Sequence, residues 1–167
     1  VLDKHRPTTV KTRMVAHNQQ LLRVDREQIQ ALDQLLQERM MALLNDRLPE
    51  CDAILFSDYG KGTLSDELVS KIISACRKNG KMVLVDPSLR RDARVYAGCT
   101  LLKPNRVEAA AAAGMEIHNQ ASLHSAAEKL LALAKPQNLV ITQGSEGMTL
   151  FRPKKKPLHF PALERPV

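Results

Sequence analysis

Short, mostly apolar runs alternate with helical segments along most of this chain, and this alternation limits the fold more than any other feature. The runs, each typical of a strand buried on both faces, are residues 53–56, 81–85, 100–102 and 138–142. The helices among them are expected at about 65–79, 106–113 and 122–135. Strands and helices in this order predict βαβ units with right-handed crossovers. We therefore predict an α/β protein with three αβα layers around a mostly parallel, Rossmann-like sheet.

The first 26 residues follow a different pattern. Residues 9–16 and 20–25 are rich in β-branched residues and can alternate between two faces, with a turn at 17–19 between them. This predicts a β-hairpin, although the turn lacks the strong Asn-Gly signal. Alternation places Lys11 and Arg13 on one face of the first strand, and Arg23 on one face of the second. Those cations could meet an acidic substrate group or simply form an exposed face, and spacing alone favours the exposed face.

A helix is predicted from about Glu27 to Leu48, where Pro49 stops it. Its apolar stripe would be Ile29, Leu32, Leu36, Met40, Leu43 and Leu44. At the other end of the chain, the turn at 143–147 leads into a strand at 148–151. Residues 157–160 are expected to return as a strand, with the lysine run at the tip of that hairpin.

The basic charge of the chain is concentrated, and this narrows the classes of partner. The net charge is +7, and residues 77–106 alone hold eight basic residues against two acidic ones. Such a concentration indicates a phosphate-bearing small molecule or nucleic acid, with a solvated surface as the plain alternative. Three Phe, two Tyr and no Trp leave little for base stacking, which argues against nucleic acid. No apolar run approaches the length of a membrane span.

The cysteines and the chain ends suggest a cytoplasmic fragment. Cys51, Cys76 and Cys99 match no zinc or disulfide spacing, so free thiols in a reducing cytoplasm are expected. The chain shows no secretory leader. It begins at Val1 and stops at Val167 without a closing element, so we expect a piece of a longer protein.

The stretch Lys103-Pro104-Asn105 ends a strand and starts a helix. Asn105 is a favoured N-cap and Glu108 falls at N3, which fits a capping box that only fixes the helix end. The same pair could instead present polar groups where free N–H groups and the helix dipole favour phosphate. Local evidence alone favours the cap.

Four polar loops follow the predicted parallel strands: Asp58 to Lys61, Asp86, Asn105 to Glu108, and Thr142 to Gly147. The carboxyl ends of parallel strands share one edge of a sheet, so these loops should converge. Each alone has a structural explanation, because an aspartate can cap a loop and a glycine can serve a positive φ. Neither a dinucleotide fingerprint nor a Walker P-loop is present. Their coincidence beside basic charge favours a phosphate site.

Asn105-x-x-Glu108 followed by Thr142-x-Gly144-x-x-Gly147 resembles the motifs of ribokinase-type (PfkB) carbohydrate kinases. Thr12, the segment Asn18-Gln-Gln-Leu-Leu-Arg-Val-Asp25 and the loop Ser57-Asp-Tyr-Gly-Lys-Gly62 resemble one bacterial branch, as do Asp86-Pro87 and residues 101–105. That branch is the D-glycero-β-D-manno-heptose 7-phosphate kinases, often the first half of a bifunctional protein with an adenylyltransferase.

The resemblance implies a ribokinase-like fold and ATP-dependent phosphorylation of the C1 hydroxyl of the heptose phosphate, for ADP-heptose and lipopolysaccharide core synthesis. It implies ATP binding by Asn105, Arg106, Val107, Glu108, Thr142, Gly144 and Gly147. Magnesium would be held near Glu108 and Asn105, with retained water. The substrate-side residues are expected to be Lys11, Arg13, Arg23, Asp58, Lys61 and Asp86, because the substrate's own phosphate needs cations.

Two segments of the kinases that this sequence resembles have no counterpart in residues 1–167. Their Gly-Ala-Gly-Asp segment, with the catalytic base, would lie just past Val167, and their amino-terminal sugar-binding βαβ region would precede Val1. We therefore expect residues 1–167 to be a partial kinase domain, with a hairpin at 1–26 and an α/β core at 27–167. The fragment alone should be inactive and the full-length protein a homo-oligomer. The alternatives are another ribokinase-type sugar or nucleoside kinase, and a non-catalytic α/β module that binds a ligand or nucleic acid.

Overall fold

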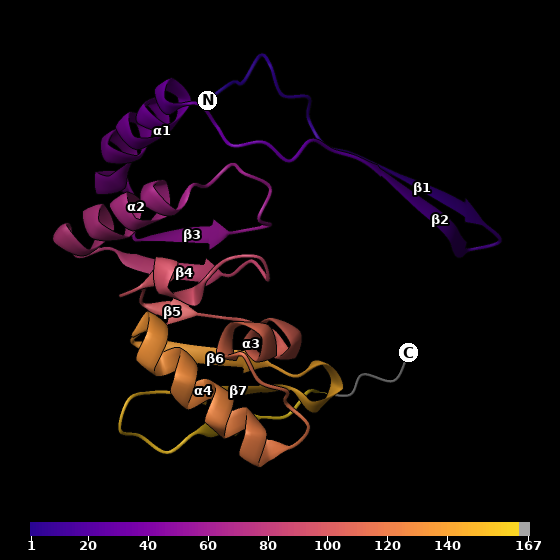
Figure 1. Ribbon diagram of the computed structural model, residues 1–167, viewed down its shortest axis with the longest axis vertical. Helices are drawn as coiled ribbons and strands as arrows, with labels where there is room; N and C mark the ends of the chain where they lie inside the picture. Colours follow the sequence, from indigo (N-terminus) through magenta and orange to yellow (C-terminus); the bar gives the residue numbers. More distant parts are fainter. Residues whose placement is uncertain (164–167) are drawn as a thin grey trace.

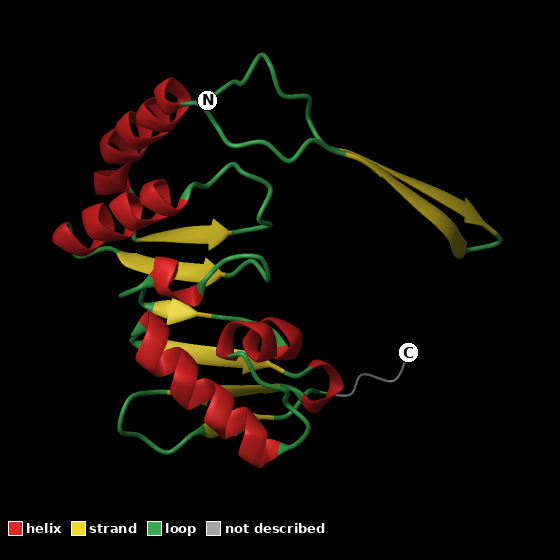
Figure 2. Ribbon diagram, in the orientation of Figure 1, coloured by secondary structure: helices red, strands yellow, loops and turns green. Residues whose placement is uncertain are grey.

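A computed structural model describes residues 1–163 and contains a six-stranded sheet in which each strand lies beside the next one in the chain, in the order β3-β4-β5-β6-β7-β8 (Figures 1 and 2). The strands are β3 Ala53–Ser57, β4 Met82–Asp86, β5 Leu101–Leu102, β6 Asn138–Thr142, β7 Met148–Phe151 and β8 Leu158–Phe160. The first four are parallel, β7 is antiparallel to β6, and β8 is antiparallel to β7. The predicted mostly parallel α/β sheet is confirmed, as is the return strand after the lysine run.

The connections between the parallel strands carry the helices α2 Asp66–Lys78, α3 Arg106–Ala113 and α4 Gln120–Ala134 and the 3-10 turn η2 Ala93–Tyr96. Every crossover advances one strand in the same direction, so right-handed crossovers place all of these elements on one face of the sheet. Figure 1 shows α3, α4 and η2 in front of the strands. Capping side chains begin α2 at Ser65 and α4 at Asn119.

The core lies between these helices and one face of the sheet. Val83, Val85, Leu102, Leu139 and Ile141 point into it and are buried. On the opposite face, Leu55 pairs in register with Leu84, and Leu84 with Leu101. No helix of residues 1–163 covers that face, and Leu55 is 68% exposed. Within residues 1–163, the strand at residues 53–56 is therefore covered on one face only, and the prediction that it is buried on both faces is wrong.

Helix α1, Gln34–Arg47, begins at Gln34 rather than at about Glu27. The Asp33 carboxylate caps it by accepting a hydrogen bond from the Leu36 N–H at 2.8 Å. The preceding residues stay extended because they bind the loop after β3, with the Leu32 N–H donating to the Gly62 carbonyl at 3.2 Å. Ile29 consequently lies outside the helix and is exposed, whereas Leu32 and Leu36 are buried as predicted.

The predicted hairpin forms from β1 Val10–Ala16 and β2 Gln19–Arg26. His17 and Asn18 both have positive φ, at 47° and 62°, which is the backbone of a type I′ turn. Figure 1 shows the hairpin standing out from the body on the side toward which β3 and β4 point. All of its residues are exposed.

Candidate functional site

The four polar loops do meet at the carboxyl edge of the parallel strands. The first contact joins the loop after β3 to the loop after β4, where the Asp58 N–H donates to the Asp86 carbonyl at 3.0 Å. Gly60 packs so closely on the second loop that a Cβ there would lie 2.4 Å from the Ser88 Oγ, and its φ is +64°. The positive φ, together with this close approach, favours glycine at this position.

The second contact is an ion pair between two side chains that follow neighbouring strands. Lys103 Nζ lies 2.9 Å from Asp86 Oδ1, and both side chains are about half exposed, at 43% and 45%. Asp86 was predicted as a site residue, whereas Lys103 was counted only as basic charge. Its position directly after β5 was the signal that would have identified it.

The third loop is the capped start of α3, and both halves of the predicted capping box form. The Glu108 N–H donates to Asn105 Oδ1 at 2.9 Å, and the Asn105 N–H donates to Glu108 Oε2 at 2.8 Å. Glu108 Oε1 makes no hydrogen bond to residues 1–163 and remains available. Val107, on the same turn, is 66% exposed.

The fourth loop lies directly beside the third. Asn105 and Thr142 form an isolated parallel β-bridge, and the Thr142 N–H donates to the Pro104 carbonyl at 3.1 Å. A second link is the ion pair between Arg106 Nη2 and Glu146 Oε2 at 2.6 Å. The Asn-x-x-Glu and Thr-x-Gly-x-x-Gly motifs, far apart in the sequence, thus form one continuous surface.

The two glycines of the fourth loop differ in their surroundings. Gly144 has φ +61° and no atom within 4 Å of the position that a Cβ would take. At Gly147, with φ +93°, a Cβ would lie 2.1 Å from the Phe160 carbonyl oxygen. Gly147 is therefore required by the fold itself, whereas Gly144 borders open space.

Asp58, predicted as a substrate-side residue, is buried, with a side chain only 4% exposed. Its carboxylate accepts from Arg91 Nε at 2.7 Å, from the Tyr96 hydroxyl at 2.7 Å and from the Gly60 N–H at 2.8 Å. The geometry gives Asp58 a role in fixing the loop and offers no free oxygen to a ligand.

Arg91 is the partner that sequence reasoning missed, because the network depends on the folding of two crossovers against each other. It also binds Asp66 and the Leu64 carbonyl. Burial opposes the charge on Arg91, but Asp58, with Tyr96 and Asp66 nearby, more than offsets this and raises the pKa of the guanidinium. A void of about 10 Å³, lined by Arg91, Tyr96 and Glu108 among others, separates this network from the start of α3.

Lys61 lies at the base of the hairpin. Its ammonium pairs with Glu27, just after β2. Beside it, Arg6 donates to the Gln30 carbonyl and to Thr63 Oγ1, both at 3.1 Å. The loop after β3 therefore fastens both arms that lead to the hairpin.

Lys11, Arg13 and Arg23 are not brought to the loops of the carboxyl edge. Lys11 Nζ lies 2.7 Å and Arg23 Nε 3.1 Å from the Asp25 carboxylate, and Arg13 stands opposite Arg23 in register. The hydrogen bond from Lys11, with Arg23 nearby, lowers the pKa of Asp25. Among residues 1–163, no hydrogen bond or ion pair joins Val10–Arg26 to the sheet. The three cations form one face of a free-standing hairpin.

The donor set at the edge fits phosphate together with a hard cation. The available groups are the amides at the start of α3, the Lys103 ammonium and the carboxylates of Asp86 and Glu108. No group of three or more His, Cys, Asp or Glu residues within 1–163 is placed to hold a metal alone. Magnesium typically takes only one or two protein carboxylates plus substrate phosphates, so this set suits it.

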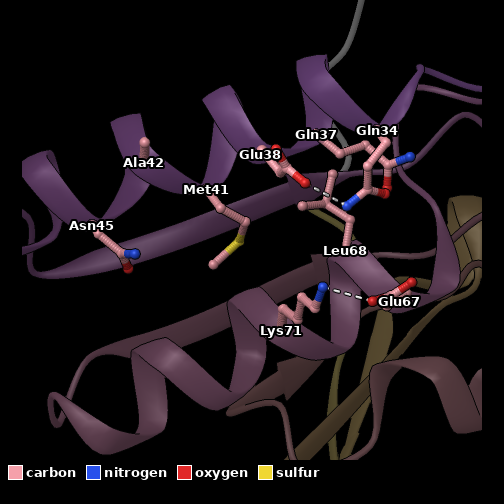
Figure 3. A pocket seen from close by; sticks show the side chains of 9 residues that line it. All are labelled: Gln34, Gln37, Glu38, Met41, Ala42, Asn45, Glu67, Leu68 and Lys71. Carbon is pink, nitrogen blue, oxygen red and sulfur yellow. Dashed lines mark hydrogen bonds and ion pairs between the residues drawn. The ribbon is translucent and has the colours of Figure 1, made fainter.

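The hollow between α1 and α2 contains none of the predicted site residues. Its volume is about 380 Å³, and polar side chains such as Gln34, Gln37 and Asn45 surround an apolar floor. Figure 3 shows Met41 pointing from α1 toward α2, with the Glu67–Lys71 ion pair on the far side. We therefore place the candidate site at the carboxyl edge.

None of the helices in the described part of the chain is long and apolar enough to cross a membrane.

Comparison with known proteins assigns the chain to a class. The fold resembles that of ribokinase from Giardia lamblia, with a TM-score of 0.71 and 17% identity over 97% of this chain and 50% of that one. Ribokinase from Arabidopsis thaliana, solved with ribose and ATP, gives a TM-score of 0.63 at 16% identity, covering 84% of this chain and 44% of that one. These likenesses establish a ribokinase-like α/β fold.

The sequence identifies the family. Residues 1–167 match the pfkB family carbohydrate kinases, and the chain belongs to that family. It is 40% identical over 167 residues to the bifunctional protein HldE of Desulfatibacillum aliphaticivorans, covering all of this chain and 34% of that protein. The chain thus spans about a third of the length of the curated relatives it matches.

Proposed function

We propose that this chain is part of an ATP-dependent sugar kinase whose nucleotide phosphates lie over the start of α3. The observation that carries the proposal is the bridge between Asn105 and Thr142, which joins the two motifs into one surface. A fold neighbour was solved with ribose and ATP, which supports the nucleotide. Residues 105–108, Thr142 and Gly144 would face the phosphates, while Gly147 maintains the turn.

Catalysis of phosphoryl transfer depends mainly on positioning and on neutralising charge, and the residues at this edge supply both. Magnesium, when bound, would neutralise the phosphate oxygens. Glu108 would hold its hydration shell through Oε1, because Oε2 serves the cap. Asn105 presents its amide beside it. Lys103 and Asp86 lie at the same edge, where the ammonium is placed to meet a phosphate. The catalytic base is proposed to lie outside this chain.

The substrate that best fits is D-glycero-β-D-manno-heptose 7-phosphate, phosphorylated at C1. Support comes from the hairpin and the Ser57–Gly62 loop, whose sequences resemble those of heptose-phosphate kinases. The hairpin gathers Lys11, Arg13 and Arg23 on one face, which is suitable for a sugar's own phosphate. Asp58 and Lys61 would act indirectly, by fixing the loop and the hairpin base.

We further propose that residues 1–167 form a partial kinase domain, with a hairpin at 1–26 and an α/β core at 27–167, in a cytoplasmic protein that self-associates. The second face of the hairpin supports self-association, because Met14, Leu22 and Val24 are each about half exposed there. Sedimentation of the full-length protein before and after Met14→Asp tests this. A wild-type monomer would contradict it.

The test of the function is substrate profiling of the full-length protein with ATP and magnesium. Transfer to heptose 7-phosphate in preference to unphosphorylated hexoses is expected. Preference for an unphosphorylated hexose or a nucleoside would overturn the heptose assignment, and no transfer to any sugar would overturn the kinase assignment. Turnover of ATP by residues 1–167 alone would contradict a catalytic base elsewhere. Salt-sensitive nucleic-acid binding without transfer would favour a binding module.

A further inference from the structure

The ion pair between Arg106 and Glu146 connects the two turns that the proposed function assigns to ATP. Arg106 is the first residue of α3, and Glu146 ends the 3-10 turn η3 Gly144–Glu146. Nη2 and Oε2 are 2.6 Å apart. Neither side chain takes part in the capping box, which Asn105 and Glu108 complete between themselves. The pair is therefore unnecessary for the start of α3, and its effect lies between the two turns.

The Arg106 end of the pair is partly buried, whereas the Glu146 side chain is about half exposed, at 51%. The Arg106 side chain is 35% exposed, and its Nε is buried without a hydrogen-bond acceptor among residues 1–163. On the other side, Glu146 Oε2 lies 3.5 Å from Gln143 Nε2. Gln143 is buried, and its Oε1 accepts from the buried Thr149 hydroxyl at 2.7 Å. The Glu146 carboxylate thus lies next to Gln143, which is hydrogen-bonded to Thr149 in β7.

The turn that Glu146 belongs to is closed by its own hydrogen bond from the Gln143 N–H to the Gly147 carbonyl at 2.8 Å, but few contacts fix its position against the third loop. It is bounded by Gly144 and Gly147, both at positive φ, so it contains the two most permissive backbone positions. Its backbone contacts with the third loop are the Asn105–Thr142 bridge and the Thr142–Pro104 hydrogen bond, both at the start of the turn. The Arg106–Glu146 pair is the link at its far end.

We infer that Arg106 and Glu146 are positioning residues that hold the two nucleotide-binding turns at a fixed spacing. The inference rests on the proposed function and goes beyond it, because it assigns the side chain of Arg106 to Glu146 rather than to ATP. A displaced turn weakens contacts with the nucleotide while leaving the sugar contacts in place. The expected signature is a higher KM for ATP with an unchanged KM for the sugar.

The experiment is a double-mutant cycle in the full-length protein with Arg106→Gln, Glu146→Gln and the two combined. Each single variant should raise the KM for ATP about five- to tenfold, the range expected of one partly screened charge-assisted hydrogen bond. The double variant should be no worse than either single one, because both remove the same contact. Exchange of the two residues, Arg106→Glu with Glu146→Arg, should restore part of the ATP affinity. The matched control is Glu67→Gln, which breaks the exposed Glu67–Lys71 pair of the same 2.6 Å length and should leave both KM values unchanged.

Several outcomes would overturn the inference. Wild-type KM for ATP in both single variants would do so, as would additive losses in the double variant, which would mean that each side chain contacts ATP separately. An equal rise in the KM for the sugar would indicate general damage. If Arg106→Gln lowers the melting temperature, Arg106→Lys keeps the charge and should give an intermediate KM for ATP; a value as high as that of Arg106→Gln would count against a contact that depends on charge. If the wild-type protein neither binds nor uses ATP, the proposed function fails first, and the inference fails with it.

Discussion

Asn105 and Thr142 lie side by side in an isolated parallel bridge, beyond the last paired residues of β5 and β6. The bridge places the N-cap of α3 against the end of β6. A capped helix start is rigid because its first N–H groups already have partners or a fixed direction. Capping and ligand binding are therefore compatible at Asn105 and Glu108, although the sequence presented them as alternatives.

Replacement of Glu108 by Gln should separate the two roles. The amide oxygen can still accept from the Asn105 N–H, so the cap is retained, but the charge that we propose faces magnesium is lost. We expect about a 10- to 100-fold loss of turnover with little loss of stability, the range seen when outer ligands of a metal are changed. Magnesium titration of kcat measures it. The control is Ser122→Ala, which breaks the second capping box, at α4, and should alter stability alone. Unchanged magnesium dependence in the Glu108 variant would mean that Glu108 serves only in the capping box.

The Arg91→Met variant should unfold more easily than a variant in which an exposed arginine is replaced. It leaves Asp58 buried with its main cationic partner removed, and such a loss is worth about 3–5 kcal/mol. Arg94→Met, at a side chain that is 70% exposed, should leave the free energy of unfolding close to the wild-type value. Urea denaturation of both variants gives the comparison, and equal midpoints would refute a structural role for the buried pair.

The two glycines of the fourth loop should respond differently to a methyl group. Gly144→Ala meets only the left-handed backbone penalty of about 1–2 kcal/mol, and its Cβ would project into the space assigned to the nucleotide. Gly147→Ala suffers the same penalty and also collides with the Phe160 carbonyl. We expect a larger loss of stability at Gly147, whereas at Gly144 the rise in the KM for ATP should exceed what its small loss of stability explains. Similar stability losses in the two variants would contradict this assignment.

The buried thiols predict a loss of stability at alkaline pH. Burial raises the pKa of the Cys99 thiol from 9.0 to about 12. The unfolded chain therefore releases this proton first, so the stability that Cys99 contributes is complete below pH 9 and is lost as pH rises toward 12. The free energy of unfolding should fall less steeply with pH in Cys99→Ala, by up to about 1.4 kcal/mol per pH unit. Equal slopes of unfolding free energy against pH in the two proteins would contradict the raised pKa of Cys99.

At neutral pH, thiol reagents should modify Cys51, which is half-buried, before Cys76 or Cys99.

The sequence was sufficient to predict the sheet, the hairpin and the convergence of the loops, because each depends on local patterns. The boundary at Gln34 was missed because residues 27–33 have a helical pattern of apolar residues, yet their backbone binds the loop after β3. Leu55 was placed in a buried strand because composition alone gives no information on which face of a strand is covered.

Predictions about individual site residues were least secure where long-range contacts decide their role. Asp58 follows a strand just as Asp86 does, and nothing nearby in the sequence separates them. Only the approach of Arg91 and Tyr96 from a different crossover buries one and leaves the other half exposed. Glu146 was passed over for the same reason, since its partner Arg106 is remote in the chain.

Because every strand of the sheet pairs with its neighbour in sequence, the sheet can be assembled by adding each new strand to one growing edge. Each addition closes no more than one connection between successive strands, so its entropy cost does not grow as the sheet widens. Pairing between successive strands keeps their sequence separation smaller than pairing between the first and last strands would, and smaller separations favour faster folding. It also allows β3 to β8 to form in order as the polypeptide leaves the ribosome, without waiting for distant segments.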